Sequence, residues 1–423
     1  MSTPTLWRNS DFRRLWAGQT ASQLGEHTAL IILPLVAVLT LGVGADQLGA
    51  LRAVGQAPLL LITLFAGVWV DRWRTRTVMV LSDVGRTLAL VGAAVAAVLG
   101  GLTLPALLVV AFVVGAMSVF FDVAYQASLT RLVRRDQLLR GNSAIEGSRS
   151  AAQIGGPALG GAMTSLLPAP IAAASSALFF VASVVSIARI GHREPIPEER
   201  RTIGNREPSP KRRRIWRQIR EGLRFVAGNP LLRTVCLASA AFQISLAAVM
   251  TAYLIFLPRD LNLSGTTVGL ALAAIGPGAL AGSLLAARLP ARFGHGVVLV
   301  GGAVLGNGVL LAVPALHGGS TATVVALILI NLVFGAFGQL VNVTVMAIRQ
   351  AVTPYEMQGR VAATITFAGM GLTPVGSLLG GLLAQHAGTR TALLLAAGVM
   401  MLSPALMALS PLARLGRVLP DPA

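Results

Sequence analysis

Twelve apolar stretches, each long enough to cross a lipid bilayer, fill almost the whole chain. A helix needs roughly 20 mainly apolar residues to span the hydrocarbon core, and a helix of a soluble core rarely needs so many without a charged face. Charged residues make up only 12% of the sequence, about half the share that soluble proteins carry. These features predict an all-α membrane protein, because a chain surrounded by lipid has little room for charge.

The hydropathy pattern predicts two sets of six helices. The first set is expected at 14–41, 48–71, 77–99, 105–130, 138–165 and 169–189, and the second at 232–258, 265–288, 296–315, 320–348, 358–385 and 391–413. The polar segment between the sets contains Pro195, Pro197, Pro208 and Pro210 and the basic run 211–214. We therefore expect an N-terminal six-helix bundle in 1–189, a basic linker in 190–231 and a C-terminal six-helix bundle in 232–423.

The net charge of +18 is spread unevenly along the chain. Of the 34 Lys and Arg, 29 lie in, or within three residues of, the termini, the linker or the segments after even-numbered predicted helices. This asymmetry follows the positive-inside rule, by which basic loops stay in the cytoplasm. It predicts a multi-pass protein of the cell (cytoplasmic) membrane with both termini and the linker in the cytoplasm, and it argues against nucleic-acid binding.

The two predicted bundles share spaced motifs, which indicates an internal repeat. Pro157 and Pro374 each follow a basic loop and precede a glycine pair, and they lie 217 residues apart. Gly67 and Gly282 each precede a basic turn, 215 residues apart. Repeats of equal topology predict two bundles related by an axis along the membrane normal. Transporters built in this way bind substrate between the halves and expose it to alternate sides.

The segment 67–76 between the second and third predicted helices reads Gly-Val-Trp-Val-Asp-Arg-Trp-Arg-Thr-Arg. It resembles motif A of the major facilitator superfamily, although Arg74 stands where a second glycine is usual. The resemblance implies a conformational latch, in which a carboxylate at the cytoplasmic rim accepts from a basic partner. The latch residues are expected to be Gly67, Asp71, Arg72, Arg76 and Arg131, with Asp83 and Arg86 assigned to the same latch.

A second motif, on the fifth predicted helix, consists of Gly156, Pro157, Gly160 and Gly161. It resembles motif C, which in this superfamily marks antiporters, usually exporters. Proline removes a backbone donor and bends a helix, while glycine permits close packing against a neighbour. We expect this motif to bend the helix at the interface between the bundles.

Four further segments are similar to the enterobactin-exporter and macrolide-efflux branch of drug:proton antiporters: 9–16, 22–25, 138–143 and 359–362. The resemblance covers essentially residues 8–412 and implies a twelve-helix major facilitator fold. It also implies proton-coupled efflux of a small hydrophobic or amphipathic molecule, such as a drug, a macrolide or a siderophore-like compound.

Charged side chains inside the membrane are costly, so each one is a candidate for function. Glu26 lies on a polar stripe of the first predicted helix, Asp122 lies in the fourth, and Glu146 and Arg149 share a face of the fifth. We expect Glu26 and Asp122 to carry protons and Arg149 to be the cation that exchanges partners. A static ion pair of Arg149 with Glu146 or Asp122 remains the alternative.

The second bundle has no acid inside a predicted helix, so its interior polar groups are amides. The side chains expected to face a substrate cleft are Gln19, Gln23, Gln126, Gln243, Asn331, Gln339 and Asn342. Hydrogen bonding between helices is the alternative for any one of them.

The sequence contains no pattern typical of an enzyme. It lacks a phosphate-binding loop, a His/Cys cluster with metal-ligand spacing and a nucleophile elbow.

We expect no cofactor and no metal. The expected partners are a small-molecule substrate, protons and the lipid bilayer, and the expected working unit is one chain. A metabolite uptake carrier and a non-transporting membrane sensor remain alternatives.

Overall fold

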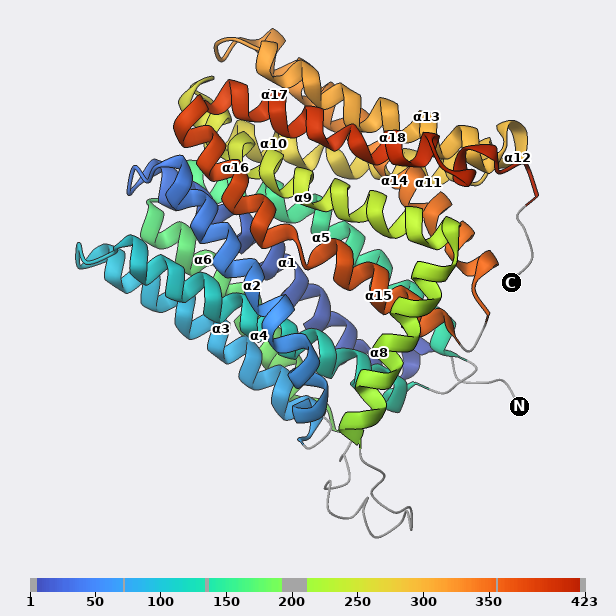
Figure 1. The fold of residues 1–423 in the computed structure, drawn as a ribbon. Helices are drawn as coiled ribbons and strands as arrows, with labels where there is room; N and C mark the ends of the chain where they lie inside the picture. The colour runs from blue at the N-terminus through green and yellow to red at the C-terminus, as the bar shows by residue number, and fades with distance from the viewer. Residues whose placement is uncertain (1–5, 71–72, 134–136, 192–210, 355–356, 419–423) are drawn as a thin grey trace. The chain divides into compact units, whose positions relative to one another are not determined.

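A computed structural model describes residues 6–70, 73–133, 137–191, 211–354 and 357–418, apart from the side chains at 64–68, 130–131, 138–139, 169 and 211–219. The described residues are helical, with connecting turns and no strand among them (Figure 1). The chain divides into two compact units. Unit 1 comprises Met1–Val43, Val54–Arg206 and Ser264–Ala273, and unit 2 comprises Gly44–Ala53, Glu207–Leu263 and Ala274–Ala423.

The expected spans are present in both halves of the chain. The first six are α1 (Ser10–Leu39), α2 (Ala45–Val70), α3 (Thr75–Val98), α4 (Leu104–Leu132), α5 (Leu138–Leu166) and α6 (Ala169–Ala188). The second six are α9 (Pro230–Arg259), α10 with α11 (Gly265–Ala273, Ile275–Ala286), α13 with a 3-10 turn (His295–Gly308, Val309–Ala315), α14 (Thr321–Val352), α15 with α16 (Gln358–Met370, Thr373–Ala387) and α17 with α18 (Thr389–Met400, Leu402–Ala408). Among the residues that the structure describes, ten spans are long and apolar enough to cross a membrane, and α2 and α5 occupy the other two predicted positions. The predicted twelve-helix membrane fold is confirmed.

Several spans of the second half are interrupted, where the sequence predicts single helices. The helical hydrogen bonding breaks between α15 and α16 at Gly371–Leu372, directly before Pro374. Proline cannot donate a backbone hydrogen bond and its ring clashes with the preceding turn, so a new helix begins with Pro374 in its first turn. The break between α17 and α18 likewise precedes Pro404.

The first span of each half begins in the same way. The Asn9 side chain accepts from the amides of Asp11 and Phe12 at the start of α1. The Asn229 side chain accepts from the amides of Leu231 and Leu232 at the start of α9. An asparagine cap satisfies amides that have no partner within the helix. The matched caps extend the repeat found in the sequence to local structure.

The predicted linker contains a helix that the sequence analysis did not anticipate. Helix α8 (Lys211–Gly228) packs against α15 and α9 within unit 2, as Figure 1 shows in yellow-green. The linker was treated as polar because of its prolines and arginines. The apolar residues spaced along 215–226 are sufficient to form one face of a helix.

The packing within each unit determines which side chains meet. In unit 1, α1 packs against α5 and α6, while α3 packs against α4 and α6. In unit 2, α9 packs against α15, α16, α17 and α18, and α14 packs against α11 and α13. The polar stripe of α1 is thereby brought to the polar side chains of α3 and α4.

Candidate functional site

A cluster of charged side chains lies inside unit 1, centred on Arg86 of α3. The Arg86 side chain is fully buried. Its Nη1 lies 3.6 Å from Asp83 Oδ1, one turn earlier on α3, and 3.8 Å from Glu26 Oε2 of α1. The Asp83 side chain is also fully buried, whereas that of Glu26 is 24% exposed. One guanidinium group therefore lies beside two carboxyl groups of different accessibility.

Ser22 of α1 connects the members of this cluster. Its hydroxyl accepts a hydrogen bond from Arg86 Nη1 at 3.1 Å and donates one to Asp83 Oδ1 at 3.1 Å. Arg86 Nη2 donates to the backbone carbonyl of Met117 in α4 at 3.3 Å. The cation is thus held by α1, α3 and α4 together.

Two aromatic rings enclose the same guanidinium group. The Arg86 Cζ atom lies 4.8 Å from the ring centroid of Phe121 and 5.0 Å from that of Phe180. A cation over an aromatic face is attracted by the ring quadrupole, and the attraction strengthens when water is excluded. Ser183, a buried residue of α6, lies beside Asp83. Apolar rings and short hydroxyl side chains therefore replace water around the charges.

Asp122 of α4 adjoins the cluster through Gln23 of α1. Gln23 is buried, and its Nε2 lies 3.5 Å from Asp122 Oδ1, at the limit of a hydrogen bond. Gln19, one turn earlier on α1, is buried as well, and its Oε1 has no hydrogen-bond partner among the described residues. The polar stripe of α1 therefore contacts acids on two other helices.

The structure shows what surrounds four of the predicted site residues. Asp83 and Arg86, predicted to belong to the latch, lie in the buried cluster beside Ser22 and Glu26. The cation nearest to Glu26 is Arg86, and the predicted partner exchange of Arg149 stays a prediction. Arg149 is partly buried and is a charged neighbour of Asp122, while Glu146 is exposed. Arg86 lies near the middle of the predicted span 77–99, and this position, more than its nearness to the segment 67–76, was the signal for burial.

One latch residue has a defined structural role. Arg76 donates to the carbonyls of Ile190 and Ala188, where α6 ends. Arg14 donates to the carbonyl of Arg189 at 2.6 Å in the same place. Cations at a helix C-terminus satisfy its free carbonyls and oppose its dipole.

The remaining latch predictions fall outside the described part of the chain. They concern Gly67, Asp71, Arg72 and Arg131.

The glycines of the motif C-like segment lie where α5 meets other helices of unit 1. A Cβ at Gly156 would lie 2.4 Å from His27 Cβ, and one at Gly160 would lie 2.9 Å from the Thr28 carbonyl oxygen. A Cβ at Gly161 would lie 2.3 Å from the Gly265 carbonyl oxygen. Only glycine permits such close backbone approach. Helix α5 continues through Pro157 without interruption.

The predicted cleft amides of unit 2 differ in their surroundings. Asn331 is fully buried and donates to the Tyr253 hydroxyl at 2.7 Å and to the Leu327 carbonyl. In this structure the amide joins α14 to α9, which is the alternative of hydrogen bonding between helices. Gln243 and Gln339 are partly buried, and Asn342 is exposed. Gln126 of unit 1 is exposed as well.

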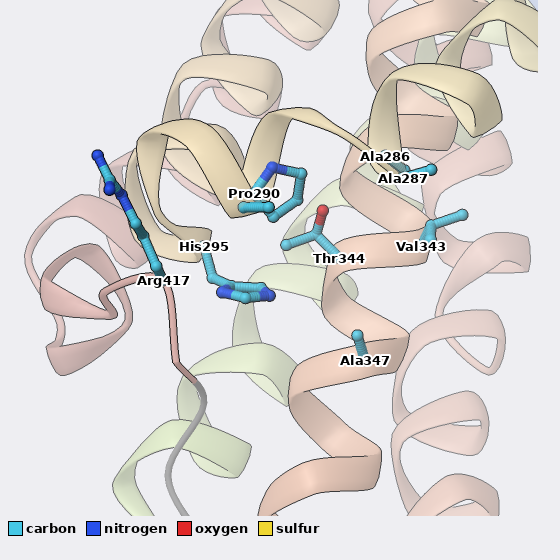
Figure 2. Close-up of a pocket in the computed structure, with 9 residues that line it drawn as sticks. Ala286, Ala287, Pro290, His295, Val343, Thr344, Ala347 and Arg417 are labelled. Carbon is cyan, nitrogen blue, oxygen red and sulfur yellow. The ribbon is translucent and has the colours of Figure 1, made fainter.

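Unit 2 also contains a cavity of about 190 Å³, lined by Ala286, Ala287, Pro290, Ala291, His295, Val343, Thr344, Ala347 and Arg417 (Figure 2). Two of its polar side chains are already engaged, because Thr344 donates to the Leu340 carbonyl and His295 Nδ1 lies 3.0 Å from the Gly416 carbonyl oxygen. The cavity holds none of the predicted site residues.

Solved structures identify the fold. The crystal structure of the nucleoside transporter NupG is similar, with a TM-score of 0.71 at 14% sequence identity, over 94% of this chain and 98% of NupG. The fold is that of major facilitator transporters. The profile of the transmembrane secretion effector family matches residues 2–418, so the chain belongs to that family and is a multi-pass membrane protein.

Curated relatives agree with this assignment. The chain is 24% identical to the uncharacterized MFS-type transporter YfiS of Bacillus subtilis over 408 residues, which covers 93% of this chain and 91% of YfiS. It is 25% identical to the multidrug efflux pump Tap of Mycolicibacterium fortuitum over 383 residues, or 88% of this chain and 89% of Tap. Family and fold are those of membrane transporters.

Proposed function

We propose that the protein exports a small hydrophobic or amphipathic molecule in exchange for protons, by alternating access. The naming of Tap as a multidrug efflux pump supports the direction and the class of cargo. The distribution of Arg supports a cytoplasmic location for both termini and for the linker, because 29 of the 34 basic residues would then face the cytoplasm. A single chain contains both halves of the repeat and is the working unit.

The observation that carries the proposal is the buried Arg86 beside Glu26 and Asp83. A buried charge is stable only when it is paired and hydrogen-bonded. One guanidinium balances one carboxylate, so the second carboxyl of the cluster is a place for a proton. Glu26 is the point of entry, because its side chain is the partly exposed member.

Protonation of Glu26 removes its negative charge and its attraction for Arg86. Arg86 then remains with Asp83 and Ser22, and release of the proton restores the original pairing. The neighbours of Glu26 on α1, His27 and Thr28, are the residues that Gly156 and Gly160 of α5 approach closely. A shift of α1 at Glu26 is therefore transmitted directly to α5.

The test uses inverted membrane vesicles from cells that lack their own efflux pumps and a panel of fluorescent drugs. An acidified lumen drives drug inward for wild-type protein, and Glu26→Gln abolishes this uptake although the protein still reaches the membrane. Glu146→Gln is the matched control, because it makes the same change at an exposed position. Movement of drug out of the acidified vesicles would indicate an import carrier, and no movement of drug by the wild-type protein would indicate a sensor. Either result contradicts the proposal.

A further inference from the structure

Helix α8 combines a basic stripe with an apolar edge. Arg220 and Arg224 lie one turn apart on α8 and form its basic stripe. In the sequence Arg213 and Arg217 continue the same spacing. Leu223 is the apolar edge beside this stripe, and in the sequence Trp216 and Ile219 precede it at helical spacing. A strongly basic helix with such an edge is typical of a helix that lies in the membrane interface.

Another side of α8 is fixed to unit 2. Glu221 Oε2 accepts from Arg360 Nη1 of α15 at 2.8 Å. A Cβ at Gly222 would lie 2.7 Å from Thr364 Oγ1, so the backbone of α8 lies directly against α15. Val226 is buried in the core of unit 2 together with Leu232. These contacts determine which way α8 faces.

The docking leaves the apolar edge and the basic stripe uncovered in the described part of α8. Leu223 is 54% exposed, and Arg220 and Arg224 are exposed on either side of it in the sequence. An exposed leucine between two arginines matches a surface that is apolar below and anionic above. The acyl boundary and headgroups of a phospholipid leaflet have this composition.

The end of α8 lies close to the membrane-spanning region. Helix α8 ends at Gly228, Asn229 caps the next helix, and α9 begins at Pro230 as one of the apolar spans. Because one residue connects them, the last turn of α8 adjoins the first turn of this apolar span. We propose that α8 is a binding surface for anionic phospholipid headgroups, with the basic stripe on the phosphates and Leu223 in the acyl boundary.

A fluorescent probe at Leu223 tests this proposal in the full-length protein, independently of transport. The single native cysteine is removed by Cys236→Ala, and Leu223→Cys is labelled with an environment-sensitive fluorophore. The labelled protein is placed in nanodiscs of phosphatidylcholine alone or mixed with phosphatidylglycerol. We expect a blue shift and several-fold brighter emission when phosphatidylglycerol is present.

Charge variants identify the source of the shift. Arg220→Gln with Arg224→Gln abolishes it, while Arg220→Lys with Arg224→Lys preserves it. Arg414→Gln with Arg417→Gln also preserves it, because it removes equal charge from exposed arginines elsewhere in unit 2. An equal shift without phosphatidylglycerol, an equal loss in the Arg414 and Arg417 control, or the same shift produced by inorganic phosphate would each overturn the proposal.

Discussion

The two units bury polar groups of different kinds. Unit 1 buries a charged cluster, with Arg86 held by Asp83, Ser22 and two aromatic rings beside Glu26. Unit 2 buries a neutral pair, in which Asn331 donates to the Tyr253 hydroxyl. The two units therefore differ in the chemistry of their buried polar groups: a cluster with carboxyl groups offers sites for a proton, whereas a neutral amide–phenol pair joins two helices.

Removal of the Arg86 cation should lower the stability of the protein more than the other changes. Arg86→Met leaves the fully buried Asp83 without its charged partner, which should destabilise the protein by about 3–5 kcal/mol. Thermal unfolding in detergent measures this as a large fall in Tm. Adding Asp83→Asn should recover part of the loss, and Arg149→Met, at a partly buried position, should change Tm little. An unchanged Tm for Arg86→Met would show that the charged cluster does not stabilise unit 1.

Glycine contacts test whether the two units pack in the same way. A Cβ at Gly161 in unit 1 would lie 2.3 Å from the Gly265 carbonyl oxygen, and one at Gly381 in unit 2 would lie 2.5 Å from the Ala45 carbonyl oxygen. Each alanine substitution should therefore cost about 1–3 kcal/mol, because backbone atoms must move. Gly155→Ala, which has room at its position, is the control in unfolding measurements. If only one of the two alanine substitutions lowered the stability of the protein, the two units would not pack in the same way.

Breaking the Asn331–Tyr253 hydrogen bond of unit 2 should lower the stability of the protein least. Tyr253→Phe leaves the buried Asn331 amide without one acceptor and should cost about 1–2 kcal/mol. Drug export should continue, measured as the susceptibility of cells that express the variant. Asn331→Leu combined with Tyr253→Phe should cost less than the two single changes added together. Loss of export in a variant that is abundant and folded would give unit 2 a role beyond packing.

The sequence predicted the spans well because hydropathy and length are properties of each segment alone. Helix α8 was missed because its apolar residues are interspersed with arginines and the preceding prolines resemble a linker. Glu26 and Asp122 could be singled out from the sequence because each is an acid within an apolar span. The contact of Arg86 with Glu26 could not be predicted, because helix packing determines which charges meet. The spacing of Asp83 and Arg86 in an apolar span was the signal that could have identified the pair.

The central claim is that a carboxyl of unit 1 carries a proton that leaves when cargo binds. Proton release by the purified protein in weakly buffered detergent, followed with a pH indicator as a transported drug is added, tests this most directly. Wild type and Glu146→Gln should release protons in proportion to the drug bound, and Glu26→Gln should bind drug and release none. Equal proton release by Glu26→Gln and wild type would contradict the account.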